Sequence, residues 1–241
     1  FEQVTRRLGM LHALREFGVP VYNEARAIER SVDKAMTSVL LHAAGVATPP
    51  TWTTESAAEA QRIVMREGAA GHALVAKPLF GSQGKGLQRV GCVDGEHVPL
   101  PALDAAPWHG VAYLQRFVPA AQQPGFDWRV LVVGGRAVTA MRRVSSDWVH
   151  NVARGARCER AAADGALARL AERAAAALDM DYAGVDLMPS DEAPQGIVVL
   201  EVNGVAAWRG LQRVTGFDIA QALVDDLLER RLAGIRGARE A

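Results

Sequence analysis

Two carboxylates and an amide in the second half of the chain have the types and spacing of a site for a hard cation. In an extended segment alternate side chains share a face, so Glu201 and Asn203 are expected to point the same way. Asp186 lies in an earlier apolar run, and a turn over residues 190–195 would pair the two runs as strands and add Asp186 to the cluster. Oxygen ligands without His or Cys suit Mg²⁺ that also holds phosphates and water. The alternative, a solvated polar strand face, is disfavoured by the continuously apolar flanks.

A glycine-rich segment between two expected strands has the features of a phosphate-binding loop. It follows Lys77, which ends a buried strand and is a candidate fixed cation. Glycines let backbone N–H groups approach an anion without a Cβ in the way. The candidate phosphate-binding residues of the loop are Gly81, Ser82, Gln83, Gly84 and Gly86. The segment is not a Walker loop. Because most glycine-rich hairpin tips have no binding role, it indicates a phosphate site only in combination with the oxygen cluster.

Further polar and apolar residues fit around a nucleotide. Lys34 lies on an expected helix and could reach phosphate, although a solvated helix charge is an equal alternative. A purine could dock where a strand ends at Gln115, Arg116, Phe117 and Val118.

Arginines on two expected strands could surround a reacting phosphoryl group. Asp127 and Arg129 open one strand, and Arg129 could act there with Arg142 or Arg143. Arg142 and Arg143 are neighbours in a strand and face opposite sides, so only one of them should enter the site. Taken singly, each arginine is more commonly a surface charge.

Composition describes an ordinary globular protein. The chain has 241 residues, no net charge and 49% hydrophobic residues, enough for one large domain or two to three small ones. The balanced charge gives no sign of a nucleic-acid partner, and we expect neither a membrane span nor a signal peptide. Cys92 and Cys158 stand alone without metal-ligand spacing, which predicts unpaired thiols in a reducing cytoplasm.

The hydrophobic pattern mixes helices and strands without strict alternation. Apolar periodicity predicts helices at residues 4–17, 25–44, 55–66, 164–179 and 218–232, with a short helix within 99–108. Strands are expected at residues 19–22, 73–77, 87–93, 111–118, 128–133, 137–144, 182–188 and 196–200, with a hairpin at Gly134-Gly135. Residues 145–160 lack a period and are interpreted as a functional loop. The prediction is an α+β fold with mainly antiparallel sheets.

In their order along the chain these pieces resemble the ATP-grasp ligases, specifically the RimK-like α-L-glutamate ligase group. The resemblance covers nearly the whole chain, and the ordered set is specific even where single motifs are not. The matching stretches are Asp33-Lys34, Lys77 with its loop, Gln115-Arg116-Phe117-Val118, Asp127-Trp128-Arg129, Arg142-Arg143, Asn151, Ala183-Gly184-Val185-Asp186, Glu201-Val202-Asn203 and Thr215-Gly216-Phe217-Asp218-Ile219-Ala220.

The resemblance implies an ATP-grasp fold in which two α+β lobes hold ATP between them. The smaller lobe would be residues 49–113, with the glycine-rich loop as a lid, and the larger lobe residues 114–241. Residues 1–48 would be the end of an N-terminal domain and a linking helix, the rest of that domain being largely absent. Magnesium, with manganese as an alternative, would be bound by Asp186, Glu201 and Asn203.

The implied reaction is ATP-dependent ligation of a carboxylate to an amine. ATP converts the carboxylate to an acylphosphate, and the amine then attacks it to leave an amide, ADP and phosphate. The resemblance gives catalytic roles to Arg129, Arg142 and Asn151 and nucleotide-binding roles to Lys34, Lys77, the loop, residues 115–118 and Asp127. Lid closure would exclude water from the acylphosphate. The expected partners are a small-molecule or coenzyme carboxylate, an amine such as an amino acid, and further copies of this chain.

Three departures from the family pattern bear on the substrate. Arg116 stands where relatives commonly have an acidic residue beside the adenine, and Val149 where they have an arginine. The turn after Asn203 reads Gly204-Val205-Ala206-Ala207 in place of the usual Ser-Pro-Gly or Ile-Pro-Gly. Residues 208–212 nevertheless resemble relatives that modify coenzymes, and this resemblance favours an acceptor such as a pterin- or furan-type C1 carrier.

Two other functions remain open at this point. One is a nucleotide-binding regulatory subunit without turnover, favoured by Val149 and the altered turn and disfavoured by the intact magnesium set. The other is an ATP-grasp phosphotransferase, which commonly employs a phosphorylated histidine. None of the six His has a persuasive context for that role.

Overall fold

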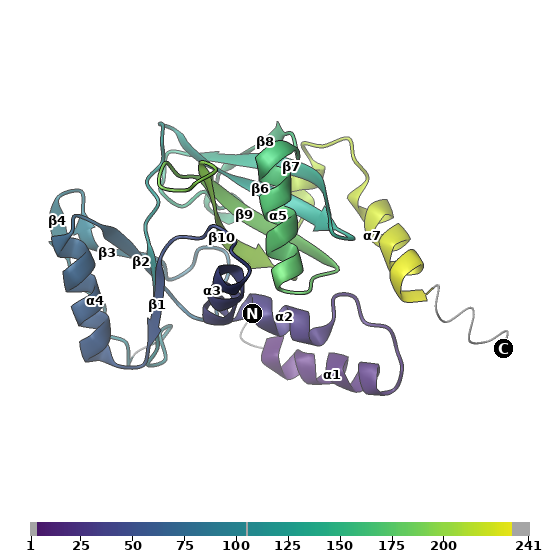
Figure 1. Ribbon diagram of the computed structural model, residues 1–241, viewed down its shortest axis with the longest axis horizontal. Coiled ribbons are helices and arrows are strands. Elements are labelled where there is room, and N and C mark those ends of the chain that lie inside the picture. Colours follow the sequence, from purple (N-terminus) through teal and green to yellow (C-terminus); the bar gives the residue numbers. More distant parts are fainter. Residues whose placement is uncertain (1–3, 105, 233–241) are drawn as a thin grey trace.

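The computed structural model describes residues 4–104 and 106–232, and it contains two antiparallel sheets covered by helices (Figure 1). The first sheet has the strand order β1-β5-β2-β3-β4 and the second β10-β9-β6-β7-β8, with five strands in each. The expected α+β class with antiparallel sheets is therefore confirmed. The strands are β1 (Thr51–Thr54), β2 (Ala73–Lys77), β3 (Gln88–Val93), β4 (Glu96–Val98), β5 (Ala112–Arg116), β6 (Gly125–Val133), β7 (Arg136–Ser145), β8 (Arg157–Ala161), β9 (Tyr182–Pro189) and β10 (Ile197–Asn203).

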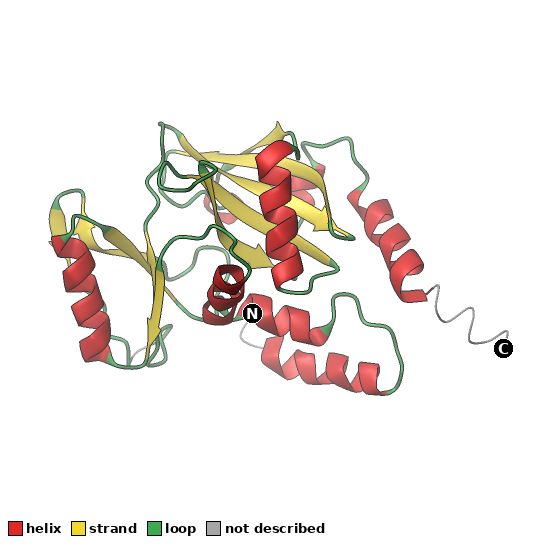
Figure 2. Ribbon diagram, viewed as in Figure 1, coloured by secondary structure: helices red, strands yellow, loops and turns green. Residues whose placement is uncertain are grey.

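The smaller sheet packs against one helix, α4 (Ala57–Ala69) (Figure 2). Ser56 caps this helix by accepting a hydrogen bond from the backbone N–H of Glu59. Apolar residues of α4 and of the strands form one core, which includes Ala60, Ile63, Val64, Leu74, Ala76 and Val90. Burial of this apolar surface holds the sheet and α4 together as a unit.

The larger sheet is covered on both faces. Helix α5 (Gly165–Ala177) lies across one face and shares the largest core with β6, β9 and β10. The opposite face is covered by α6 (Arg209–Gln212) and the start of α7 (Ile219–Leu227), through Leu211 and Ile219. A π-helical turn over Leu228–Leu232 continues α7. The predicted Gly134-Gly135 hairpin joins β6 to β7.

The N-terminal segment contains three helices, α1 (Val4–Glu16), α2 (Ala25–Val32) and α3 (Lys34–Ala43). The single helix predicted for residues 25–44 was wrong, because Asp33 breaks it. Asp33 has extended backbone (φ −84°, ψ 106°), and its carboxylate caps α3 by accepting hydrogen bonds from the N–H groups of Ala35 and Met36. Capping side chains compete with helix continuation, and a 3.6-residue periodicity does not reveal that competition.

Three other local predictions differ from the structure. Residues 19–22 form no strand, and the described residues within 99–108 form turns without a helix. The loop predicted over residues 145–160 contains a short 3₁₀ turn, Val152–Arg154, and ends in β8. Strand β8 has no continuous apolar run, because it is an edge strand whose residues are exposed or half-buried.

The two sheets correspond to the two lobes that the sequence analysis expected. Strand β5 pairs with β1 and β2 and extends to Arg116, so a boundary at residue 113 falls inside a strand of the smaller sheet. The division into lobes stays a proposal, and its outermost parts, residues 1–3 and 233–241, lie outside the described residues. Within the described chain, no helix has the length and apolar character needed to cross a membrane. Both cysteines are free thiols.

Candidate active site

A cavity of about 470 Å³ lies between the two sheets. One wall comes from β2 and the glycine-rich loop that follows it, and the other from β6, β9, β10 and the loop after β7. The chain segment that ends β5, residues 115–118, closes one side. Its volume lies within the usual range for small-molecule sites.

The predicted metal ligands meet in this cavity because of a β-bulge. Val199 pairs with Leu187, and Glu201 pairs with Asp186, so Leu200 is an extra residue in β10. A bulge of this kind re-aims the side chains that follow it. It places Glu201 opposite Asp186 on one face, and Asn203 follows two residues later on that face. All three side chains line the cavity.

The amide of Asn203 is oriented by a hydrogen bond. Its Nδ2 donates to the carbonyl oxygen of Gly184 at 3.2 Å. Its Oδ1 has no hydrogen-bond partner among the described residues and is left as an acceptor. The described residues hold no cluster of three or more His, Cys, Asp or Glu that could bind a metal. The proposed set instead combines two carboxylates with one amide oxygen, which fits a hard cation.

Two arginines surround Asp186. Nη2 of Arg129 donates to Oδ2 of Asp186 at 2.7 Å, and Arg143 lies 3.0 Å from the same oxygen. Burial opposes ionisation of Asp186, but the charges of Arg129 and Arg143 outweigh it and lower the pKa of this carboxyl group. Arg143 also donates from Nε to Asp127 at 2.7 Å. Burial raises the pKa of Asp127 to about 6, against the opposing effect of Arg143.

The prediction of Arg142 as a site residue was wrong. Arg142 lies outside the cavity lining, donates to Glu159 at 2.6 Å and stacks on Phe126, with 5.2 Å between its guanidinium carbon and the ring centroid. Its neighbour Arg143 lines the cavity, in agreement with the expectation that only one of the pair enters. Strand alternation separates the two residues but does not say which one faces inward.

Two half-buried lysines, Lys77 and Lys34, line the cavity beside the glycine-rich loop. Nζ of Lys77 donates to Oε1 of Gln115 at 2.6 Å, and Nζ of Lys34 donates to the carbonyl oxygen of Gly81 at 3.0 Å. Burial lowers the pKa of Lys77 to about 8, although Glu201 acts against that shift. Burial likewise lowers the pKa of Lys34. Lys34, which sequence alone left at even odds with a surface charge, therefore contacts the glycine-rich loop.

The glycine-rich loop reaches across the cavity to the other wall. Gly81, Ser82, Gln83 and Gly84 line the cavity, whereas Gly86 does not. Gly86 instead packs on prolines, and a Cβ there would come 2.9 Å from Cγ of Pro78. Gly84 has φ +67°, and a Cβ on it would lie 2.9 Å from Cγ1 of Val149. The tip of the loop thus contacts the loop after β7 from the other lobe.

The segment that ends β5 contains the residues that the sequence analysis predicted to bind a nucleotide, and it lies at the cavity. Gln115, Arg116, Phe117 and Val118 all line the cavity, together with the apolar side chains of Val75, Met188 and Leu200. The charge of Arg116 is paired with Glu67, at 2.7 Å, and lies 3.8 Å from Glu192. The charge of its guanidinium is therefore paired with protein carboxylates, although its buried Nε has no hydrogen-bond partner among the described residues.

The loop after β7 brings six consecutive residues to the cavity, residues 148–153. Asn151 caps the 3₁₀ turn through a hydrogen bond that Oδ1 accepts from the N–H of Ala153 at 3.1 Å. His150 is buried, and burial together with Arg143 lowers its pKa, so it is neutral at pH 7. The aromatic ring of Trp148 lies 6.0 Å from that of Phe117.

The cavity is positively charged. Its described lining contains seven Lys and Arg side chains against three Asp and Glu, the basic ones being Lys34, Lys77, Lys85, Arg116, Arg129, Arg143 and Arg209. The side chains of Lys85 and Arg209 have no hydrogen bond or ion pair within the described part of the chain. The sequence analysis did not name Lys85 or Arg209 as site residues, because single basic residues carry no signal without the fold.

The fold and this cavity define an ATP-grasp ligase, and comparison with solved structures agrees. The ATP-grasp ligase PsnB complexed with its minimal precursor has a TM-score of 0.63 at 25% identity over 95% of this chain and 70% of that one. A RimK domain protein from Sphaerobacter thermophilus has a TM-score of 0.63 at 24% identity over 92% of this chain and 76% of that chain. Another structure of PsnB contains Mg and ADP.

The chain belongs to the RimK-like ATP-grasp family, whose model matches residues 31–227. The tetrahydromethanopterin:alpha-L-glutamate ligase of Methanococcus maripaludis is 34% identical over 94% of this chain and 75% of its own length. The protein of the same name from Methanocaldococcus jannaschii is 33% identical over 92% of this chain and 75% of its own length. The resemblance deduced from the sequence is confirmed, and the chain is an enzyme of the carboxylate–amine ligase class.

Proposed function

We propose that this chain uses ATP and Mg²⁺ to join a carboxylate to an amine through an acylphosphate, and that it adds a glutamate-like amino acid to a small molecule or coenzyme. One observation carries the proposal. The bulge in β10 sets Glu201 opposite Asp186, and the same cavity contains the half-buried Lys77 from the other lobe. A hard-cation site and a phosphate-binding cation on facing walls support a nucleotide between them.

Residues of both lobes have distinct parts in this proposal. Asp186, Glu201 and Asn203 would hold the metal, which when bound neutralises charge on the nucleotide phosphates. Lys77, Lys34 and the N–H groups of the glycine-rich loop bind and orient the phosphates. Arg129 and Arg143 lie beside Asp186 and stabilise negative charge that develops on the transferred phosphoryl group and on the tetrahedral state.

Base binding and water exclusion follow from the same cavity. The apolar side chains of Val75, Met188 and Leu200 bind the purine beside residues 115–118. Contact between Gly84 and Val149 closes the lid loop on the opposite lobe and keeps water from the acylphosphate. The reaction needs no nucleophilic side chain of the protein, because the acylphosphate is itself reactive toward the amine.

The charge of the cavity supports anionic substrates beyond ATP. The seven lining cations outnumber the three lining carboxylates, and Lys85 and Arg209 are unpaired within the described chain. A nucleotide with its magnesium offsets only part of that excess. Relatives named tetrahydromethanopterin:alpha-L-glutamate ligase support glutamate as the amine and a pterin-type C1 carrier as the acceptor. The sequence-based preference for a coenzyme acceptor points the same way.

The proposal is tested by measuring ADP release with acidic and neutral amino acids against a panel of pterin- and furan-type carboxylates. Amide product with an acidic amino acid, and loss of turnover by orders of magnitude in Glu201→Gln with the fold retained, are the expected results. Nucleotide that binds tightly but is never turned over across the panel would instead support the regulatory-subunit alternative. An isolated phosphoryl product without amide would support the phosphotransferase.

A further inference from the structure

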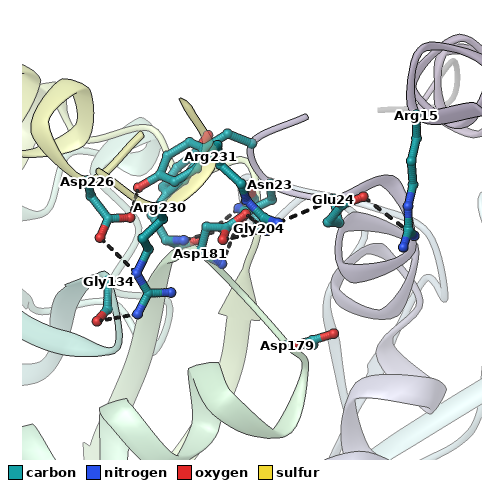
Figure 3. A network of polar contacts seen from close by, with 12 residues as sticks. Arg15, Asn23, Glu24, Gly134, Asp179, Asp181, Gly204, Asp226, Arg230 and Arg231 are labelled. Atoms are coloured by element: carbon teal, nitrogen blue, oxygen red, sulfur yellow. Dashed lines mark hydrogen bonds and ion pairs between the residues drawn. The ribbon is translucent and has the colours of Figure 1, made fainter. Parts of the chain in front are cut away.

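A buried asparagine outside the cavity links the N-terminal segment to the strands that carry the proposed metal ligands. Asn23 precedes α2 and is 1% exposed. Its Oδ1 accepts hydrogen bonds from the N–H groups of Asp181 at 2.6 Å and Tyr182 at 2.9 Å. Its Nδ2 donates to the carbonyl oxygens of Tyr182 at 2.7 Å and Gly204 at 2.9 Å, as Figure 3 shows. All four bonds go to backbone groups around β9 and β10.

The Asn23 side chain therefore adds a hydrogen-bonded link between two strands. It connects the first residue of β9 to the residue that follows β10. Gly204 comes directly after the proposed ligand Asn203, so a fixed Gly204 constrains the backbone of Asn203. Among short side chains, only an amide can donate two hydrogen bonds and accept two, as this place requires.

Gly204 is held on its other polar group as well. Its N–H donates to Oγ of Ser31 on α2 at 3.3 Å, and Ser31 in turn donates to the carbonyl oxygen of Ile28. A Cβ at position 204 would lie 2.6 Å from Oγ of Ser31 and 2.9 Å from Cε of Met180. The close approach explains a glycine here, where the family pattern has a bulkier residue.

Outside this inner contact, a network of ion pairs joins the two ends of the described chain. Arg231 lies 2.6 Å from Asp181 and 3.4 Å from Glu24. Tyr22 donates to Asp226 at 2.7 Å, and Arg230 bonds Asp226 and the carbonyl oxygen of Gly134 (Figure 3). These contacts hold the chain ends to the sheet without touching Asn203 or Gly204. They provide a control for effects of stability alone.

We propose that Asn23, together with Ser31, is a positioning residue that fixes Gly204 and so aims Oδ1 of Asn203 into the metal site. The inference rests on the proposed function, since it needs Asn203 as a ligand. The hydrogen bond from Nδ2 of Asn203 to the carbonyl oxygen of Gly184 sets the plane of the Asn203 amide. Asn23 and Ser31 set the backbone from which that amide projects. Partners that orient a ligand commonly change metal affinity 10–100-fold when removed.

The test measures Mn²⁺ binding by electron paramagnetic resonance in the presence of a non-hydrolysable ATP analogue, alongside thermal unfolding. Asn23→Asp keeps both acceptor bonds but cannot donate to Tyr182 and Gly204, and we expect roughly tenfold weaker Mn²⁺ binding. Ser31→Ala is the milder variant, expected to weaken Mn²⁺ binding about threefold, within the range seen for neutral hydrogen bonds. If Asn23→Asp does not fold, the Mn²⁺ affinity of Ser31→Ala tests the positioning role instead. Arg230→Gln removes the contacts to Asp226 and Gly134, neither of which bonds to Asn23 or Gly204, and should lower the melting temperature without changing Mn²⁺ affinity.

A double variant separates positioning from general loosening. If Asn23 acts through Asn203, then Asn23→Asp changes Mn²⁺ affinity little when Asn203→Ala is already present. Additive losses, or an equal loss in Arg230→Gln, would show that Asn23 only stabilises the fold and would overturn the inference. Glu201→Gln tests the proposed metal site separately. If Mn²⁺ binding survives Glu201→Gln, the proposed metal site itself is wrong. If Glu201→Gln abolishes Mn²⁺ binding but Asn23→Asp leaves the affinity unchanged, the metal site stands and only the positioning role of Asn23 is refuted.

Discussion

At the scale of single residues, the chemistry of the cavity depends on which charges the protein leaves unbalanced. Asp186 is balanced by two arginines, while Lys77 has only an uncharged hydrogen-bond partner, Gln115. Lys77 is thus a half-buried cation that has no ion pair and that Glu201 and Asp186 stabilise only through space, so a phosphate beside it would favour its protonated form. Burial brings its pKa down to about 8, which makes its charge sensitive to mildly alkaline pH.

This charge predicts a pH dependence of nucleotide binding. Phosphate beside Lys77 favours the protonated form, so its pKa in the complex lies above that of the free protein. Below pH 8 the lysine is protonated in both states and affinity is constant with respect to this group. Above pH 8 the free protein loses a proton that binding must restore, and affinity falls by up to about tenfold per pH unit. Calorimetric titration with a non-hydrolysable ATP analogue from pH 7 to 10 measures this slope.

Lys77→Arg is the matched control, because arginine keeps its charge over that range. The variant should bind more weakly but with a flatter pH profile. An equal slope in both proteins would assign the titration to another group.

The same scale shows what sequence could and could not predict of the site. Alternation along the strands placed Glu201 with Asn203 and separated Arg142 from Arg143. The bulge at Leu200 was not predictable, because its apolar side chain continues the run of β10 without a break. Nor could sequence decide which of the two arginines faces Asp186. That choice is set by the register of β6 with β7, which itself shifts between Leu131 and Val132.

At the scale of elements, the predicted helices and strands were mostly right where a long apolar pattern dominates. They failed where one polar side chain decides the backbone. Asp33 divides the predicted helix into α2 and α3. Asn23 hydrogen-bonds to the chain at the start of β9 and so fixes the end of the segment 19–22, which was predicted to be a strand. Side-chain hydrogen bonds of this kind win locally over propensity, and their backbone partners lie at positions that sequence does not specify.

The cap at Asp33 predicts a coupled loss of stability and binding. Asp33→Ala leaves the N–H groups of Ala35 and Met36 without their acceptor and should lower the free energy of unfolding by about 1 kcal/mol. Lys34 is the first residue of α3, so fraying there also weakens nucleotide binding. Urea denaturation and calorimetry measure the two effects. Asp33→Asn retains the acceptor oxygen and should keep most of the stability and most of the nucleotide affinity. If Asp33→Asn loses as much as Asp33→Ala, the cap is not the cause.

The lid loop offers a second prediction at this scale. Gly84→Ala places a Cβ against Val149 in a left-handed backbone, so it should hinder closure and weaken binding of the ATP analogue several-fold. The backbone strain alone costs about 1–2 kcal/mol. Gly95 has φ +89°, and a Cβ added there would meet no other atom within 4 Å, so Gly95→Ala carries the strain without the contact. We expect Gly95→Ala to lose stability and keep its nucleotide affinity. Equal affinity losses would mean that strain, not the contact, is responsible.

At the scale of the whole molecule, function requires that two lobes meet, and side-chain contacts join them across the cavity. Gly84 of the lid approaches Val149, Arg116 lies 3.8 Å from Glu192, and Arg89 of β3 stacks on two aromatic rings. The ordered set of motifs was enough to predict both lobes, because each lobe has its own sheet and core. Their closed arrangement was not predictable, since Arg89 carried no signal in the sequence and its ring partners lie on other segments.

The stacking of Arg89 gives the last prediction. Its guanidinium carbon is 5.5 Å from the ring centroid of Phe117 and 5.7 Å from that of Trp148, so it connects the smaller sheet to the loop after β7. Cation–π contacts at partly exposed sites contribute about 0.5–2 kcal/mol. Arg89→Ala should therefore speed hydrogen exchange several-fold in residues 145–156 and weaken nucleotide binding, while the cores of both lobes exchange as before.

Hydrogen exchange read by mass spectrometry distinguishes this coupling from a local defect in the smaller lobe. Arg62→Ala removes an exposed arginine of α4 that pairs with Glu59, three residues away on the same helix, and serves as the control. It should leave residues 145–156 unchanged. If Arg89→Ala also leaves that loop unchanged, Arg89 does not couple the two lobes, and the loop after β7 closes independently of β3.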